Sequence, residues 1–348
     1  MSTPAALPAL APPIPRQIAL AHCESDYLAL SVWLERRPQL GEDAEPLVLH
    51  HRPSGSGLLA VFDGSGGSGS SAAWQDPRGH TRTGAWVGSR VARLGAERWF
   101  AQHVEQAAEP DAESLQEQLR DLLTRVQSPT RSKVIGSMRR QLPTTMAAIS
   151  YRPQTGSHLV EALWAGDSRG YVLRPETGLH PLTRDHTEET DALVQLTQDP
   201  PMTNVLSADR AFVVATSGIQ TRSKCVMICA TDGFFGYVST PADFELHLLT
   251  TLAGAGTMHE WAQALAARVA TYTGDDASLA LVAVGYPGFD ELRATFTGRT
   301  HQILAWLTPR PDPDDQERMR QWREQRWAEY RTEYEKFMPP IPVPEEEQ

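Results

Sequence analysis

The sequence predicts an α/β fold of the α+β kind: two packed, mostly antiparallel β-sheets flanked by helices as an α-β-β-α sandwich, with a C-terminal helical extension. Short apolar runs closed by turn residues recur as far as residue 286, which is typical of strands. These runs come in adjacent pairs, which favours antiparallel hairpins over regular βαβ winding. Longer segments with apolar residues at helical spacing lie between the pairs and can cover the sheets.

Strands and helices are expected in alternating groups along the chain. The apolar runs predicted to be strands are residues 17–21, 27–33, 58–62, 145–151, 159–165, 170–173, 226–230 and 278–284. The segments predicted to be helices are residues 83–106, 113–126, 187–196, 241–252 and 259–272. Gly274 follows the last of these helices and is a typical stop signal.

The chain divides into four parts by composition. Residues 1–15 are rich in proline and alanine and are expected to be a flexible tail, and residues 16–286 form the main domain. Residues 287–338 form a helical extension whose second helix carries an aromatic stripe. We expect this stripe to pack on the main domain, and a partner-binding surface is the alternative. Residues 339–348 are expected to be disordered.

The overall composition is that of a soluble globular protein. Apolar residues make up 41% of the 348 residues and charged residues 22%, close to the usual averages. The formal net charge of -11 disfavours nucleic-acid binding, because proteins that bind nucleic acid present basic surfaces to phosphates. The apolar runs are shorter than the roughly 20 residues that cross a bilayer. We therefore expect a cytoplasmic protein with neither nucleic acid nor membrane as a partner.

The cysteines and histidines lack the spacing of metal or redox sites. Cys23, Cys225 and Cys229 include no C-x-x-C pair, and the histidines include no H-E-x-x-H. We interpret the cysteines as reduced core residues, with a redox or zinc site as the alternative.

Aspartates stand at the ends of several predicted strands. Asp63 and Asp232 follow apolar runs, whereas Asp26 and Asp275 directly precede them. A carboxylate at a strand end can be fixed by the sheet and still face a cleft, which suits hard cations that require oxygen ligands. The alternative is that these residues only form turns, in which Asp is common.

Five short motifs occur in a fixed order around these aspartates. They are DGSGG at residues 63–67, AGDSRGY at 165–171, LTRDHT at 182–187, CATDGF at 229–234 and DDAS at 275–278. In this order they resemble the D-G-x-G-G, G-D-S-R, L-T-x-D-H-[ST], S-D-G and D-[ND]-x-[ST] motifs of the metal-dependent protein phosphatases, the protein-phosphatase-2C-like family in its bacterial type. One such motif alone would be weak, but the ordered set is specific.

The resemblance implies a centre with two divalent cations, Mn²⁺ or Mg²⁺. It implies that Asp63 bridges the two cations and that the backbone carbonyl of Gly64 binds one of them. Asp232 and Asp275 would hold the other cation, and Asp167 would hold a third, weaker one. Two such cations lower the pKa of a bridging water, so that hydroxide can attack a phosphate without a nucleophilic side chain.

The resemblance also implies an activity and a further catalytic residue. The family hydrolyses phosphoserine and phosphothreonine in proteins and opposes serine/threonine kinases, so a phosphoprotein is the expected partner. Asp26 stands where the family has the aspartate of a terminal N-E-D, and it would orient a metal-bound water. Asp185 and His186 could instead form a catalytic pair, but a structural hydrogen bond of His186 is the preferred interpretation.

Four departures from the family pattern leave a second function open. Ala21, with His22 beside it, replaces a phosphate-binding arginine, and Ser65 replaces the histidine or methionine of other members. Pro143 replaces a glycine, and Gly236 replaces an acidic residue of the third-cation site. His22 and Ser65 are the remaining weak candidates for contacts with substrate. The alternative to an enzyme is therefore a phosphatase-like binding or regulatory module with little or no turnover.

Overall fold

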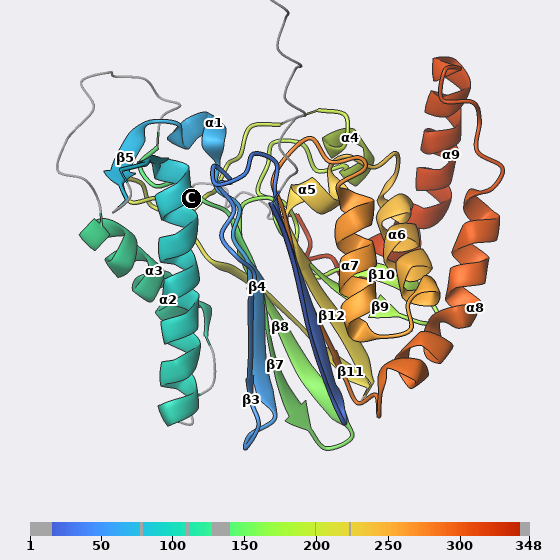
Figure 1. Cartoon of the computed structure of the whole chain (residues 1–348), viewed down its shortest axis with the longest axis horizontal. Helices are drawn as coiled ribbons and strands as arrows, with labels where there is room; N and C mark the ends of the chain where they lie inside the picture. Colours follow the sequence, from blue (N-terminus) through green and yellow to red (C-terminus); the bar gives the residue numbers. More distant parts are fainter. Residues whose placement is uncertain are drawn as a thin grey trace, which may run out of the picture.

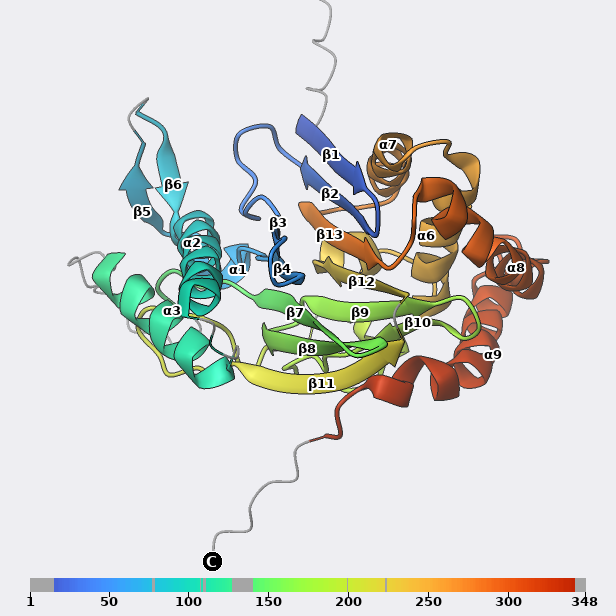
Figure 2. The same cartoon turned by 90° about the horizontal axis from the view of Figure 1, so that it is seen from below.

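Two β-sheets pack face to face, and helices cover both outer faces (Figures 1 and 2). This computed structural model describes residues 16–341, apart from residues 77, 78, 107, 109, 110, 127–139, 199 and 223. The tail expected at residues 1–15 and the end of the tail expected at 339–348 lie outside the described residues. The predicted α-β-β-α sandwich is confirmed.

Among the described residues, the first sheet contains six strands, and every neighbouring pair that is hydrogen-bonded runs antiparallel. In spatial order these strands are β1 (Arg16–Glu24), β2 (Tyr27–Glu35), β13 (Ala277–Val284), β12 (Cys225–Ala230), β9 (Arg169–Arg174) and β10 (Gly178–Pro181). Every residue of β13 is buried, because this central strand is covered by the second sheet on one face and by helices on the other.

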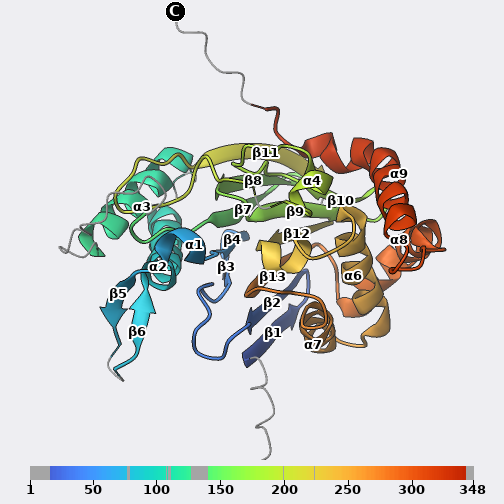
Figure 3. The ribbon, with the colours of Figure 1, turned by 90° about the horizontal axis from the view of Figure 1, so that it is seen from above.

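The second sheet contains five strands in the described part of the chain and is also antiparallel. Its order is β11 (Ala215–Arg222), β8 (Ser157–Ala165), β7 (Met146–Gln154), β4 (Ser56–Val61) and β3 (Leu47–His51). A small hairpin of β5 (Ala72–Gln75) and β6 (Thr81–Thr83) projects next to helix α2, residues Gly84–Gln106 (Figure 3). Apolar side chains of both sheets, such as Val61, Ile149, Val172 and Met227, form the core between them.

The helices form two outer layers (Figure 3). The second sheet packs against α2 (Gly84–Gln106) and α3 (Ala112–Val126), and the leucines Leu115, Leu119 and Leu123 of α3 repeat every four residues on its buried face. The first sheet packs against α6 (Pro241–Gly254), α7 (Met258–Val269), α8 (Phe289–Leu307) and α9 (Gln316–Tyr334). In the described part of the chain, no helix is long and apolar enough to cross a membrane.

The remaining helices are single turns. They are α1 (Gly66–Gly69), α4 (Ala192–Gln195), α5 (Asp232–Phe235) and the 3-10 helix Glu335–Phe337. The helix expected at 187–196 is therefore shortened to α4. Local hydrogen bonds explain the difference: Glu189 Oε1 accepts from the backbone amides of Thr190 and Asp191, and Thr187 Oγ1 donates to the Glu189 carbonyl. Such bonds compete with the helical ladder.

The aromatic stripe of α9 packs against the main domain. Trp322, Trp327, Tyr330 and Tyr334 are buried in the same apolar core as strands β2, β12 and β13. The preference for intramolecular packing over an exposed partner surface is thus confirmed. The segment after α9 is also held, because Arg184 Nε donates to the carbonyl of Pro339 at 2.7 Å.

Two of the three cysteines match the prediction of core residues. Cys225 and Cys229 are buried, and burial raises the pKa of both thiols. Cys23 is exposed on the edge strand β1, so the prediction is wrong for this residue. Cys23 lies beyond the predicted apolar run at 17–21, between His22 and Glu24, which are exposed as well.

Candidate metal centre

The register of the first sheet brings three acidic segments to one end of the sandwich. Ala230, at the end of β12, pairs with Leu279 near the start of β13, and Ala277 pairs with Leu34 near the end of β2. Asp232, which follows β12, and Asp275 and Asp276, which precede β13, therefore share this end with the loop after β2. We call that loop, which joins β2 to β3, the 36–46 loop.

The second sheet contributes two more aspartates to the same end. Asp63 follows β4, and its carbonyl accepts hydrogen bonds from the Thr145 amide at 2.8 Å and from Thr144 Oγ1 at 2.6 Å. Asp167 follows β8, and Thr145 Oγ1 is 2.6 Å from Oγ of the neighbouring Ser168. The helical turns α1 and α5, which follow Asp63 and begin at Asp232, lie at this end in Figures 1 and 3. Asp63, Asp167, Asp232 and Asp275 are thus brought together as expected.

Asp26 does not belong to this group, and the prediction that it shares the site is wrong. It lies in the turn between β1 and β2, where its amide donates to the Tyr286 carbonyl and its carbonyl accepts from the Gly285 amide. Tyr27 pairs with Val284, at the far end of β13 from Asp275. At about 3.3 Å per residue, the length of β2 puts Asp26 roughly 25 Å from the acidic end.

Asp43 and Glu42, in the 36–46 loop, stand at the acidic end instead. Asp43 is only 2% exposed, and its Oδ2 accepts from Ser278 Oγ at 2.8 Å and from Thr231 Oγ1 at 3.1 Å. The carboxyls of Asp43 and Asp63 lie close enough for each to influence the pKa of the other. The sequence did carry a signal for this position: the pair Glu42-Asp43 matches the family's terminal E-D better than Ser25-Asp26 does, and it also lies between apolar runs.

Asp276 is a second functional position that the sequence reasoning missed. Its Oδ1 accepts from the Arg36 amide at 2.8 Å, and its Oδ2 accepts from the Glu42 amide at 2.6 Å. Asp276 therefore fastens the 36–46 loop to the start of β13. The second aspartate of the DDAS motif thus has a structural role of its own, which is to hold this loop.

The carboxylates of this acidic cluster repel one another. Burial, followed by the charges of neighbouring aspartates, raises the pKa of Asp43 to about 7 and that of Asp167 to about 8. The pKa of Asp63 is also raised, by burial first and then by Asp43 and Asp232. Asp167 Oδ1 is buried and has no hydrogen-bond partner among the described residues. These acids need either protons or cations as counter-charges.

The donor set fits divalent cations that keep part of their water. Within the described residues, no three acidic, histidine or cysteine side chains converge as a ready-made metal site. Mg²⁺, however, commonly takes only one or two carboxylates and retains several waters. The repelling carboxylates and the buried oxygen of Asp167 supply hard oxygen ligands of this kind. The residues present therefore fit the cations that the resemblance implies.

The glycine-rich loop after Asp63 lies against Glu42. A Cβ on Gly64 would come within 2.6 Å of the Glu42 carbonyl oxygen, and a Cβ on Gly66 within 2.0 Å of Glu42 Oε2. Only glycine allows this close approach. Ser65 stands between these glycines, and its Oγ is buried without a hydrogen-bond partner in the described part of the chain.

His22 lies away from the acidic cluster. It is in β1, where it pairs with Ala29, and Ala29 pairs with Val282 in the second half of β13. Its Nε2 is 3.5 Å from Glu24 Oε1. The structure does not support a contact of His22 with substrate, because His22 lies toward the same end of the sheet as Asp26, opposite the acidic cluster.

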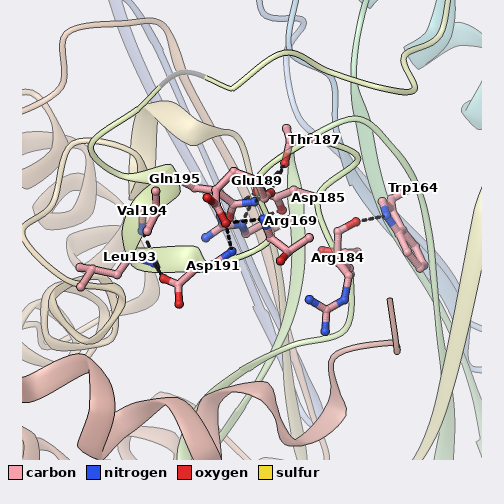
Figure 4. Close-up of polar contacts among 12 residues, drawn as sticks. Trp164, Arg169, Arg184, Asp185, Thr187, Glu189, Asp191, Leu193, Val194 and Gln195 are labelled. Atoms are coloured by element: carbon pink, nitrogen blue, oxygen red, sulfur yellow. Dashed lines mark hydrogen bonds and ion pairs between the residues drawn. The ribbon is translucent and has the colours of Figure 1, made fainter. Parts of the chain in front are cut away.

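The segment after β10 is fastened by buried polar contacts (Figure 4). Arg169 binds both oxygens of Asp185, at 2.9 Å and 2.7 Å, and Gln195 Oε1 at 2.7 Å. His186 Nδ1 accepts from the Gly166 amide at 3.1 Å. His186 is therefore held by a structural hydrogen bond, as the preferred interpretation has it, and Asp185 is bound to arginine.

Similarity to known proteins is found at the level of structure only. No protein-family model and no curated protein sequence matches the chain. A phosphatase from Toxoplasma gondii has 15% identity and a TM-score of 0.53, with 77% of this chain and 96% of that chain covered. The PPM Ser-Thr phosphatase MsPP from Mycobacterium smegmatis has 19% identity and a TM-score of 0.47, covering 77% and 97%. The catalytic domain of the serine threonine protein phosphatase PstP, in complex with 2 manganese ions, has 16% identity and a TM-score of 0.45, covering 78% and 98%.

Proposed function

We propose that this chain, which has the fold of PPM-type protein phosphatases, hydrolyses phosphoserine and phosphothreonine in proteins with Mn²⁺ or Mg²⁺ and opposes a serine/threonine kinase. The observation that supports it most is the acidic cluster, in which separate segments of both sheets supply carboxylates to one end of the sandwich. Its members are Asp43, Asp63, Asp167, Asp232, Asp275 and Asp276. The order of the motifs in the sequence supports the same function.

The chain's own residues have separable tasks in this proposal. Asp63, Asp232 and Asp275 would hold the principal cations, together with the backbone carbonyl of Gly64. Asp167 would hold a weaker one. The cations, when bound, supply Lewis acidity and lower the pKa of bound water. Such chemistry needs no nucleophilic side chain.

Asp43 would orient the attacking water. Ser278 and Thr231 both donate to its Oδ2, so that oxygen is fixed and the carboxylate cannot rotate freely. A carboxylate held in this way offers its remaining lone pairs to water from a fixed position, and such alignment contributes to catalysis. This role is the one first assigned to Asp26.

The 36–46 loop also offers cationic groups for the substrate phosphate. Five positions before Asp43, where the resemblance leads us to expect an arginine, the chain has Pro38. Arg36 and Arg37 precede it and are exposed. The Arg36 amide is held by Asp276, so its side chain starts from a fixed point beside the cluster. We assign the phosphate contact to these two arginines.

The second candidate function is a binding module without turnover. It is favoured by Ser65, by Pro143 in place of glycine and by Pro38 in place of arginine. Release of phosphate from para-nitrophenyl phosphate and from a phosphothreonine peptide, with Mn²⁺ and after chelation, separates the two functions. We expect the wild type to release phosphate in the presence of Mn²⁺ and the Asp63→Asn variant to release none. Tight binding of the phosphopeptide with no release from either substrate would favour the binding module.

A further inference from the structure

Arg90, on α2, binds the backbone of three consecutive residues in the 36–46 loop. Its Nη1 donates to the Glu42 carbonyl at 3.2 Å. Its Nη2 donates to the Gly41 carbonyl at 3.3 Å and to the Asp43 carbonyl at 3.0 Å. One guanidinium therefore binds the carbonyls of all three residues. It fixes the backbone of the loop at Glu42 and Asp43, whose side chains are acidic.

The partners of Arg90 are neutral carbonyl and hydroxyl oxygens. Nη1 also donates to the Trp86 carbonyl at 3.1 Å and to Ser89 Oγ at 3.2 Å, and the guanidinium lies 4.0 Å from the centre of the Trp86 ring. Burial lowers the pKa of Arg90 to about 10, so it keeps its charge at neutral pH. A buried arginine with neutral partners is suited to fixing backbone geometry, because its planar fork holds several acceptors at once.

The peptide groups of Glu42 are held from both sides. Asp276 Oδ2 accepts from the Glu42 amide at 2.6 Å, whereas Arg90 and Ser89 Oγ, the latter at 2.6 Å, donate to the Glu42 carbonyl. The carbonyl of the adjacent Asp43 is held by Arg90 on α2, and its carboxyl points to Ser278. The orientation of Asp43 therefore depends on contacts from β13 and from α2.

We propose that Arg90 is a positioning residue of the acidic cluster: by holding the carbonyls of residues 41–43, it sets the place of the Asp43 and Glu42 carboxylates. This inference rests on the proposed function. Without the guanidinium, three buried or partly buried carbonyls lose a donor, and the loop can shift. Displacements of about 1 Å at a catalytic group are enough to lower turnover about 100-fold.

A cavity beside Arg90 makes chemical rescue possible. Its volume is about 600 Å³, and its lining includes Trp33, Arg82, Trp86 and Arg90. In an Arg90→Ala variant, guanidinium ion at a few millimolar could enter this space and donate to the same carbonyls. Rescue by guanidinium and not by ammonium would identify the planar fork, rather than the charge, as the active feature.

The test compares Arg90→Ala and Arg90→Lys with Arg93→Ala as the matched control. Arg93 is three residues further along α2, and its Nε donates to the carbonyl of Glu45 at 2.9 Å, in the same loop but beyond the residues 41–43 that Arg90 holds. We expect Arg90→Ala to lower kcat about 100-fold with a smaller change in KM, to weaken Mn²⁺ binding by calorimetry, and to regain activity with guanidinium. Arg90→Lys should be nearly as impaired, whereas Arg93→Ala should stay within about threefold of wild type.

Two further measurements separate positioning from plain stabilisation. Amide exchange of residues 36–46 should be faster in Arg90→Lys than in wild type at equal global stability. Folded Arg90→Lys with wild-type kcat, Mn²⁺ affinity and loop exchange would overturn the proposal. Absence of Mn²⁺-dependent turnover in the wild type would refute the proposed function instead, while calorimetry and amide exchange would still decide the role of Arg90.

Discussion

Ser278 Oγ donates a 2.8 Å hydrogen bond to Oδ2 of Asp43, although the two residues are 235 positions apart in the sequence. Thr231 Oγ1 donates to the same oxygen at 3.1 Å and accepts from the Ser278 amide at 2.9 Å. This network joins Asp43 to the segments that precede Asp232 and follow Asp275. These contacts place Asp43 within the acidic cluster.

Separate substitution of Asp43 and of Asp26 tests this placement. Asp43→Asn should lower phosphatase activity by at least about 100-fold, because it removes a charge from the cluster and alters the oriented carboxylate. Asp26→Asn should leave activity unchanged, since the residue is at the opposite end of the sheet. Asp26 has a φ of 66°, a conformation that asparagine tolerates, so the control should also fold normally. A large loss of activity in Asp26→Asn with normal Asp43→Asn would contradict the placement.

The sequence predicted the layers and most elements, but it could not decide between Asp26 and Asp43. Both aspartates lie close to apolar runs, and the better match of Glu42-Asp43 to the family's terminal E-D covers only two residues. Deciding between them requires the direction of each strand and its register in the sheet, which depend on distant partners such as β13. DGSGG and GDSR could be found from the sequence because each motif has several fixed residues, and their aspartates Asp63 and Asp167 lie near each other in the structure. The polar edge strand β11 was missed because Ile219 is its only large apolar residue.

The glycines after Asp63 offer a matched pair of substitutions. A Cβ on Gly66 would meet Glu42 Oε2 at 2.0 Å, whereas a Cβ on Gly67 meets nothing within 4 Å. Gly66→Ala should therefore displace Glu42 and lower Mn²⁺-dependent turnover about tenfold or more, and Gly67→Ala should keep wild-type turnover. Kinetics with para-nitrophenyl phosphate across a Mn²⁺ titration provide the measurement. Equal activity of the two variants would mean that the Glu42 carboxylate has no part in the site.

Arg169 and Asp185 should stabilise the fold only when both are present. Its side chains are 4% and 6% exposed, so either residue alone would leave a buried, uncompensated charge. Arg169→Met and Asp185→Leu should each lower the unfolding free energy by about 3–5 kcal/mol, and the double variant should lose less than the sum. Urea denaturation of the four proteins in a double-mutant cycle measures this. Strict additivity would show that the pair is not coupled.

His247, on α6, should contribute to the pH dependence of stability. Burial lowers its pKa from 6.5 to about 4 in the folded protein. The unfolded chain therefore binds more protons than the folded chain between these pH values, and this contribution to stability is lost as the pH falls from 6.5 to 4. The effect amounts to at most about 3 kcal/mol. We expect His247→Gln to lose less stability than wild type over this range, as measured by denaturation at several pH values; parallel curves would exclude the contribution.

The C-terminal helix α9 should behave as part of the core. Trp322 is 7% exposed, whereas Leu304 on the neighbouring α8 is 46% exposed. Trp322→Ala should lower the unfolding free energy by about 3–5 kcal/mol, and Leu304→Ala should change it by less than about 1 kcal/mol.

A third variant tests the contact between α9 and the segment after β10. Trp327 Nε1 donates to Asp191 Oδ2 at 3.2 Å, and Arg331 donates to the same oxygen at 2.8 Å. Trp327→Phe keeps most of the buried apolar surface but removes one of these bonds, so it should cost only about 1 kcal/mol.

If α9 were instead a docking element for another protein, Trp322→Ala would keep the wild-type melting temperature and lose only a partner. Thermal melts of the three variants, each compared with activity toward para-nitrophenyl phosphate, distinguish these outcomes, because a core role predicts loss of stability ahead of any loss of turnover.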